Sequence, residues 1–266
     1  MKISRSEYYY HKNHQTNIYK ESNRKLDIQI LQIYRESQGI YGAPKIAYII
    51  RKSGYNVSIK RVGKRMRFLK IKSRVIKKYK PYGSKNKVIE DNKENLLKQD
   101  FKANKPGEKI VADITYIYIQ NHGWTYLATL EDLYNRAIIG HSYGKTIDAE
   151  LVLRSIENAE SKGKLKEGAI FHSDLGSQYT SALVENKLKQ LKLKHSYSKK
   201  GYPYDNACME SFNDILKKEE VNLKKYYTFD EARIAIFKFI EGWYNRKRIH
   251  SAIGYKMPND MEEIVS

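Results

Sequence analysis

Residues 109–145 read KIVADITYIYIQNHGWTYLATLEDLYNRAIIGHSYGK and contain three runs that are rich in β-branched and aromatic residues. The first run covers 109–120, and the turn residues Asn121-His122-Gly123 separate it from a second run at 124–135. A third run follows at 136–145. Short runs of this kind, joined by turn residues, predict a meander of three antiparallel strands.

Strands and helices alternate after this meander. The pattern predicts strands in GAIFHSD at 168–174 and in KHSYS at 194–198, and helices at 148–163, 180–193 and 206–220. A further helix begins at Thr228, where Thr228 and Glu231 form a capping box and Ile236, Ile240 and Trp243 make one stripe. We therefore expect an α/β fold with a mixed sheet flanked by helices.

The composition restricts the class of protein. The chain has 266 residues, of which 41% are hydrophobic, so it can bury a core. Its single cysteine, Cys208, excludes an internal disulfide framework and a cysteine-based zinc site. No run approaches the ~18 apolar residues of a membrane span, and MKISRSEYYYHKNH at 1–14 lacks the apolar centre of a secretory signal. We expect a soluble protein of the cytoplasm.

Positive charge is concentrated in the N-terminal part of the chain. Residues 1–105 contain 27 basic and 8 acidic side chains, whereas 106–266 contain 23 and 22. This asymmetry indicates that the N-terminal part binds a polyanion and that the remainder of the chain acts on it. Charge for general solubility is the simpler alternative, and a membrane-binding arm is disfavoured because no apolar helix face with Trp or Phe anchors accompanies the charge.

Residues 1–80 are expected to form a basic, all-helical domain that resembles a helix-turn-helix. Pro44 marks the start of one short helix, and Ser58 can cap a second helix whose Val62, Met66 and Leu69 lie on one face. Residues 81–105 read as a linker, with a short helix expected around 94–101.

Eleven basic and no acidic residues lie between Lys60 and Lys80. Contact with the DNA backbone would relieve their mutual repulsion, although a solvated lysine face would carry the same residues. The residues expected to bind DNA here are Lys60, Arg61, Lys64, Arg65, Arg67, Lys70, Lys72 and Arg74.

Three acids stand out in the α/β part of the chain. Asp113 interrupts an apolar strand, Asp174 ends a later strand, and Glu210 lies in the helix predicted at 206–220. Burying carboxylates together is unfavourable unless a cation compensates their charge. Oxygen ligands without His or Cys favour Mg²⁺ or Mn²⁺.

The arrangement resembles the D-D-E transposases and integrases, and more narrowly the catalytic subunit from the second reading frame of the bacterial IS-three group of insertion sequences. The matching stretches are ADITYI (112–117), FHSDLGSQYTS (171–181), YDNACMESFNDILKKE (204–219) and YNRKRIHSAIGYKMPNDME (244–262). The resemblance extends over nearly the whole chain, and the 35 residues between Asp174 and Glu210 match the family spacing. Leu175 and Cys208 are small departures from the family pattern.

The resemblance implies an RNase H-like integrase catalytic core at 106–225, followed by a C-terminal helix and tail at 226–266 that pack on it. It implies a transposase that cleaves and transfers DNA strands with two Mg²⁺ or Mn²⁺ ions, held by Asp113, Asp174 and Glu210. Lys217, two helical turns after Glu210, would steady a DNA phosphate. Expected partners are the element's terminal repeats, target DNA, further copies of the chain and the first-reading-frame product, in the bacterial cytoplasm at the nucleoid.

Several other residues carry weaker expectations. Asn206 either touches DNA or caps its helix, and Arg246, Arg248 and His250 are candidates to line a DNA path. Asp132 is expected to order its own loop, His172 to be a satisfied core histidine, and Gln178 and Tyr179 to shape the loop beneath the substrate. Two other functions stay open at this point, an RNase H-like nuclease and a DNA-binding regulator without catalytic activity.

Overall fold

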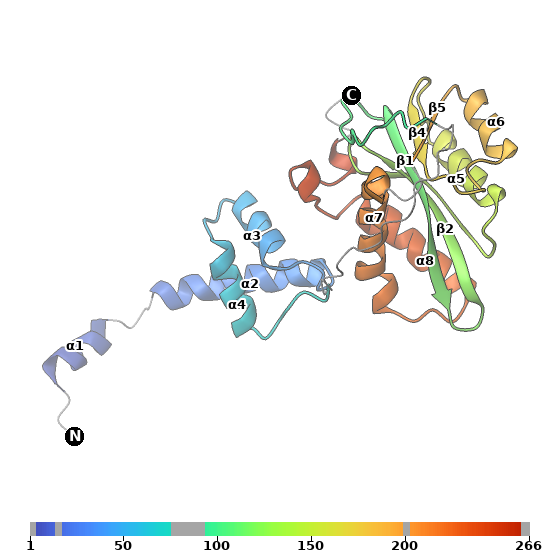
Figure 1. The fold of residues 1–266 in the computed structure, drawn as a ribbon. Coiled ribbons are helices and arrows are strands. Elements are labelled where there is room, and N and C mark those ends of the chain that lie inside the picture. Colours follow the sequence, from blue (N-terminus) through green and yellow to red (C-terminus); the bar gives the residue numbers. More distant parts are fainter. Residues whose placement is uncertain (1–3, 14–17, 76–93, 199–202, 262–266) are drawn as a thin grey trace. The chain divides into compact units, whose positions relative to one another are not determined.

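The computed structural model describes residues 4–13, 18–75, 94–198 and 203–261 (Figure 1). The chain divides into two units, residues 1–78 and 79–266, and each is described by itself. Part of the basic run, residues 76–80, lies outside the described residues.

Helices make up the N-terminal unit, as the sequence predicts. They are α1 (Arg5–Asn13), α2 (Ile18–Glu36), α3 (Ala43–Lys52) and α4 (Ile59–Phe68). The Ser58 side chain caps α4 by accepting a hydrogen bond from the backbone N–H of Arg61, and Val62 and Met66 on α4 are buried. Helices α2, α3 and α4 pack on one another around these apolar side chains, because each presents one apolar stripe.

The second unit is built on a five-stranded mixed sheet in the order β3-β2-β1-β4-β5 (Figure 1). Its strands are β1 (Lys109–Ile119), β2 (Gly123–Asp132), β3 (Ile138–Gly144), β4 (Ile170–Ser173) and β5 (Lys194–Tyr197). The first three are antiparallel, whereas β4 runs parallel to both β1 and β5. The expected meander and mixed sheet are confirmed.

Helices cover both faces of this sheet (Figure 1). Helices α5 (Ala149–Ser161) and α6 (Ala182–Gln190) pack on one face, and α7 (Ala207–Glu219) and α8 (Phe229–Phe237) pack on the other. A π-helical segment, Lys238–Tyr244, continues α8. Four short 3₁₀ segments complete the unit, at Pro203–Asn206, Val221–Leu223, Ser251–Ile253 and Asn259–Met261. Thr228 caps α8 as predicted, accepting from the N–H of Glu231.

Strand β1 contributes to two separate hydrophobic cores. Ile110 and Ala112 face α5 and α6, whereas Val111, Ile117 and Ile119 face α7 and α8. This alternation follows from the two-residue period of a strand. Asp113 therefore lies on the face that α7 covers.

Helix α5 approaches the sheet closely at Gly140 on β3. A Cβ atom at Gly140 would lie 2.4 Å from the carbonyl oxygen of Ser155 and 2.8 Å from the Cβ of Ala159. Only a residue without a side chain permits this packing distance.

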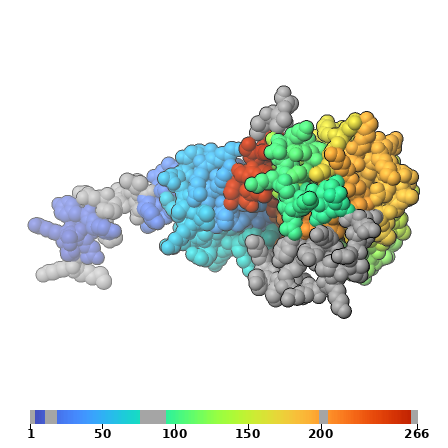
Figure 2. Space-filling view, turned by 45° about the horizontal axis from the view of Figure 1, so that its top comes forward, coloured from blue at the N-terminus to red at the C-terminus, as the bar shows by residue number. Residues whose placement is uncertain are grey.

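Residues 94–105, predicted as linker, pack against the sheet. Leu97 is buried in the core under α7 and α8, and the backbone N–H groups of Leu96 and Leu97 donate to the hydroxyl of Ser196. In the space-filling view the green residues that follow residue 94 lie beside the yellow and orange ones (Figure 2). Residues 94–101 form turns instead of the expected short helix, because these contacts fix their backbone. In the described ranges no helix is long and apolar enough to cross a membrane.

Candidate functional site

Asp113 lies in the middle of β1 and is half-buried beneath α7. The side chain of Asn213 on α7 donates a hydrogen bond of 2.7 Å from its Nδ2 to Oδ2 of Asp113. Burial raises the pKa of Asp113 to about 7, with further contributions from the negative charges of Asp174 and Glu210. The three acids are therefore close enough to interact electrostatically.

Asp174 follows directly after β4 and is exposed. Strand β4 pairs in parallel with β1, with Ile170–His172 opposite Lys109–Val111. Two residues further along, the chain reaches Asp174 after β4 and Asp113 within β1, so both acids lie toward the same end of the sheet. The N–H of Gly176 donates to Oδ1 of Asp174 at 2.9 Å. A Cβ atom at Gly176 would lie 2.9 Å from the same oxygen, so a side chain there would displace the Asp174 carboxylate.

Glu210 lies in the first turn of α7 and is exposed. Glu210, Asn213 and Lys217 follow one another at intervals of three and four residues, which places them on one face of the helix. Because Asn213 reaches Asp113, this face is directed toward β1. Lys217 is half-buried on the same face.

Four buried polar atoms without a hydrogen-bond partner in the described residues belong to side chains around Asp113. They are Oγ1 of Thr129, the hydroxyl of Tyr179, Oδ1 of Asn206 and Oδ1 of Asn213. Thr129 is the cross-strand partner of Asp113, and the phenol of Tyr179 interacts with the charges of Asp113 and Asp174. Unpaired buried polar atoms are rare, and their concentration here is typical of a site that binds water, an ion or a substrate.

The chemistry of these donors fits a hard divalent cation. The amide oxygens of Asn206 and Asn213 belong to side chains that contact Ala112 and Asp113, and a cation would offset the burial and the repulsion that together raise the pKa of Asp113. In this conformation, no three His, Cys, Asp or Glu side chains within the described ranges are grouped closely enough to hold a metal ion.

Asn206 occupies the N-cap position of α7 but does not cap the helix. Its Nδ2 instead donates to the carbonyl oxygen of Ala112, next to Asp113, at 3.4 Å. The alternative that Asn206 serves as a helix cap is therefore wrong.

The polar residues near the two aspartates have structural contacts. His172 is buried between the hydroxyls of Ser196 and Ser198, at 2.8 and 3.0 Å, and burial lowers its pKa to about 4. Asp132 orders its loop by accepting from the N–H groups of Gly107 and Tyr134. Tyr179 is buried in the core beneath α5 and α6, and burial raises the pKa of its hydroxyl. Gln178 lies near Gly176, since a Cβ there would meet its Oε1 at 3.1 Å.

The basic residues of the N-terminal unit divide into two groups. Arg65 pairs with Asp27 on α2, with Nε 2.7 Å from Oδ1, and Arg61 donates to Ser22 and Asn23. These two arginines attach α4 to α2. Of the eight basic residues expected to bind DNA, the other six are exposed to solvent, namely Lys60, Lys64, Arg67, Lys70, Lys72 and Arg74.

Arg248 departs from the expectation that it contacts DNA. It is 7% exposed, and its Nε and Nη2 donate to both carboxylate oxygens of Glu219 at 2.8–3.0 Å. Its Nη1 also lies 3.2 Å from the ring nitrogens of His250, which is buried as well. Both side chains thus hold the C-terminal segment on α7, and only Arg246 of the three expected residues is exposed.

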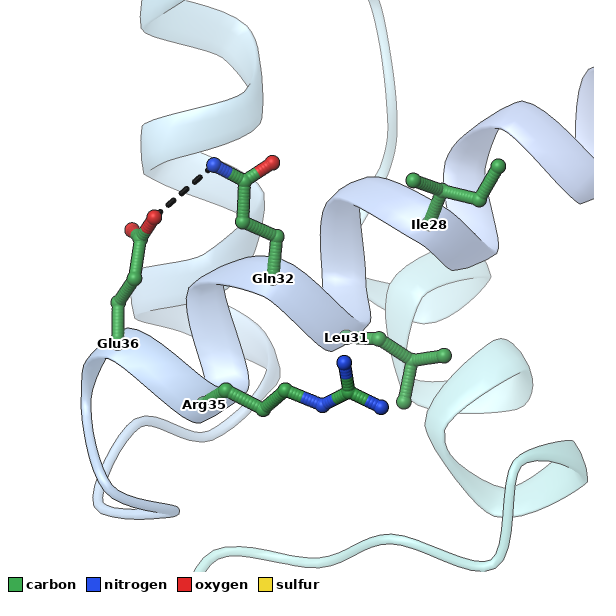
Figure 3. Close-up of a pocket in the computed structure, with 5 residues that line it drawn as sticks. All are labelled: Ile28, Leu31, Gln32, Arg35 and Glu36. Carbon is green, nitrogen blue, oxygen red and sulfur yellow. Dashed lines mark hydrogen bonds between the residues drawn. The ribbon is translucent and has the colours of Figure 1, made fainter.

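Two grooves contain none of the three acids. One, of about 330 Å³, is lined on α2 by Ile28, Leu31, Gln32, Arg35 and Glu36, where Gln32 donates to Glu36 (Figure 3). The other, of about 510 Å³, lies between β3 and α8, with His141, Arg233 and Phe237 in its wall.

Asn213, Thr129 and Gly176 are site residues that the sequence reasoning missed. Asn213 carried a signal, because it stands three residues after Glu210 and four before Lys217. Thr129 could be found only through the register of β1 and β2, which places it opposite Asp113.

Comparison with known families matches three parts of the chain. Models described as "Integrase core domain" match residues 103–203 and 191–258, and one described as "HTH-like domain" matches residues 20–79. The chain is 38% identical over 239 residues to the transposase for insertion sequence element IS904 of Lactococcus lactis, covering 90% of this chain and 93% of the relative. It is 36% identical over 236 residues to transposase InsF for insertion sequence IS3A of Escherichia coli, covering 89% and 81%. A solved structure of the HTLV-2 integrase catalytic core domain in complex with magnesium aligns with a TM-score of 0.47 at 16% identity, over 60% of this chain and 99% of that one.

Proposed function

The chain belongs to the insertion-sequence transposases with an integrase core domain, and we propose that Asp113, Asp174 and Glu210 are the acids with which it cleaves and joins DNA. Its function is the transposition of a mobile element. The observation that supports the assignment of the acids is geometric: β4, which ends at Asp174, pairs in parallel with β1, and Asn213, three residues after Glu210 on α7, donates to the Asp113 carboxylate.

The three acids would hold Mg²⁺ or Mn²⁺, and two ions are expected. When bound, such ions activate the attacking oxygen of water or of a DNA 3′-hydroxyl and stabilise the leaving oxygen. Strand β1 supports Asp113 from within the sheet, so this acid is the best placed to define the position of the site. Asp174 and Glu210 approach it from a loop and from a helix.

Lys217 would neutralise a phosphate of the bound DNA. It shares the face of α7 with Glu210, and a cation there favours the approach of the DNA backbone. The exposed basic residues of α4 and of the segment after it would hold the flanking duplex through its phosphates. Arg246 is a candidate for a further phosphate contact, and Asn206 for a contact beside Glu210.

The proposed partners are those that the resemblance to this family implies. The chain would act on the terminal repeats of its element and on target DNA, as an assembly of several copies, in the bacterial cytoplasm at the nucleoid. The first-reading-frame product would join it as a fusion or as a partner and contribute to recognition of the repeats.

The test uses the full chain and a duplex that ends in the inverted repeats flanking its gene. With Mg²⁺ or Mn²⁺ the protein should produce new 3′ ends at the repeat tips and join them to a second duplex, and EDTA should stop both. Asp113→Asn should abolish both steps while gel-shift retention of the duplex persists, and Asp214→Asn, exposed on the helix that carries Glu210, should behave as the parent.

Three outcomes would count against the proposal. Full activity of Asp113→Asn would remove Asp113 from the site. Cleavage of RNA–DNA hybrids without any joining of DNA would indicate a nuclease. Tight binding of the repeats without cleavage, even with the first-reading-frame product added, would indicate a regulator.

A further inference from the structure

We propose that Asn213 is a positioning residue that holds the Asp113 carboxylate in place relative to Glu210. The inference rests on the proposed function, because it concerns the same three acids. Its first support is a hydrogen bond of 2.7 Å from Nδ2 of Asn213 to Oδ2 of Asp113. Asn213 is 8% exposed, so water competes little for this contact.

An amide suits this position better than a charged donor. A carboxylate can only accept hydrogen bonds, so the amide nitrogen of Asn213 must face it and the amide oxygen must point away. The amide thereby orients Asp113 without cancelling the negative charge that a metal ion would use. A lysine or arginine at the same place would form an ion pair and compete with the metal.

The other end of the amide gives a second, independent observation. Oδ1 of Asn213 is buried and has no hydrogen-bond partner among the residues that the structure describes. Thr129 lies opposite Asp113 on β2, and its Oγ1 is likewise buried without a hydrogen-bond partner among the described residues. A residue present only to fasten α7 to the sheet would satisfy both ends of its amide. The unpaired oxygen beside Asp113 indicates that the amide serves the site.

Helix α7 joins these contacts to Glu210. Asn213 lies three residues after Glu210 and Asn206 four before it, so all three share a helix face. Asn206 donates to the carbonyl oxygen of Ala112, and Asn213 donates to the next residue, Asp113. The two amides bracket Glu210 and fix the helix to two consecutive residues of β1. Since the Asn206 contact is longer, at 3.4 Å, Asn213 is the principal element.

The experiment measures Mn²⁺ binding to the full chain by electron paramagnetic resonance, together with kcat and KM for joining of repeat-end DNA. The variants are Asn213→Leu, which keeps the branched shape but removes the donor, Asn213→Ala, Asn206→Ala and Asp113→Asn. Asp214→Asn is the matched control, because it is adjacent to Asn213 on α7 and exposed. Urea unfolding of each variant identifies those that fail to fold.

Asn213→Leu should weaken Mn²⁺ binding by about 10- to 100-fold, the usual effect of removing a side chain that orients a metal ligand. It should lower kcat by a similar factor and leave KM for DNA unchanged. Asn213→Ala should give the same result if Asn213→Leu folds poorly. Asn206→Ala should have a smaller effect, and Asp214→Asn none.

The outcomes separate the two proposals. Parental Mn²⁺ affinity and kcat in folded Asn213→Leu and Asn213→Ala, with binding lost in Asp113→Asn, would overturn the positioning role and leave the proposed function intact. Parental Mn²⁺ binding in Asp113→Asn would overturn the assignment of the acids, and the role of Asn213 with it.

Discussion

Arg248 and Glu219 form a buried ion pair that fixes the C-terminal segment to α7, the helix that carries Glu210. Both side chains are under 10% exposed, and the guanidinium contacts both carboxylate oxygens at 2.8–3.0 Å. The indole nitrogen of Trp243 donates to the same carboxylate at 3.1 Å. The segment after the π-helical turn is thus part of the support of the candidate site.

Removing one member of this pair should be costly. Arg248→Ala leaves the buried carboxylate of Glu219 without a cation, and we expect a loss of about 3–5 kcal/mol in the free energy of unfolding. Urea unfolding followed by far-UV circular dichroism measures it. Arg246→Ala is the control, since this exposed side chain should change stability by less than about 0.5 kcal/mol. A small effect of Arg248→Ala would show that α7 is supported mainly by apolar packing.

Gly140→Ala tests the contact of α5 with the sheet. The added methyl group would meet the Ser155 carbonyl oxygen at 2.4 Å, so α5 must move, at an expected cost of about 1–3 kcal/mol. The change in the melting temperature is the measurement. Gly242→Ala, where a Cβ meets nothing within 4 Å, should leave stability unchanged or improve it. Equal melting temperatures for the two variants would contradict the close approach.

Gly176→Ala should affect activity more than stability. Its Cβ would lie 2.9 Å from Oδ1 of Asp174, so the carboxylate must turn away from its present position. We expect joining of repeat-end DNA to fall at least about tenfold, because a misplaced ligand weakens the metal site, while the urea midpoint stays near that of the parent. Unchanged activity would mean that the position of Asp174 is set by the bound metal alone.

His172 should make stability depend on pH. Burial lowers the pKa of His172 to about 4 in the folded chain, whereas an unfolded histidine has a pKa of about 6.5. The unfolded state therefore takes up a proton first as the pH falls, and stability should drop between pH 6.5 and 4 by about 3 kcal/mol. His172→Gln, which does not titrate, should flatten this part of the profile in urea unfolding series. An unchanged profile would assign the dependence to other groups.

The basic side chains of α4 should separate into two classes by mutation. Lys64→Ala removes an exposed charge, so DNA binding should weaken. The slope of the logarithm of the binding constant against the logarithm of the salt concentration should become shallower by about the amount that one phosphate contact contributes. Arg65→Ala leaves Asp27 without its bidentate partner, so the N-terminal unit should lose stability. Fluorescence anisotropy at several salt concentrations and thermal unfolding measure the two effects. Reversed results would place Arg65 at the DNA.

The sequence was sufficient to predict the meander, the mixed sheet and the N-terminal helices, because these depend on local periodicity and capping. Ser58 and Thr228 cap their helices as their positions indicate. Sequence spacing also singled out Asp113, Asp174 and Glu210, and their assignment as the catalytic acids stays a prediction.

The residues whose structure or role differs from the prediction are held by contacts with distant parts of the chain. Arg248 looks like a surface arginine in a basic stretch, and only the folded chain brings Glu219 to it from 29 residues away. Residues 94–101 have helix-forming composition, but their backbone donors bind Ser196, about 100 residues later. Asparagine is a common helix cap, yet the side-chain amide of Asn206 donates a hydrogen bond to the carbonyl oxygen of Ala112 instead. Local patterns contain no information about such partners.

The pairing of β1 with β2 has a consequence for the fidelity of folding. A slip of one residue in this ladder would turn Asp113 toward the apolar side chains of Phe171 and Ile156 on the other face, and would turn Val111 out of its own core at the same time. Such a misaligned chain loses its core together with its acid. Correct alignment of this ladder is therefore needed both for the two hydrophobic cores and for the placement of Asp113 beneath α7.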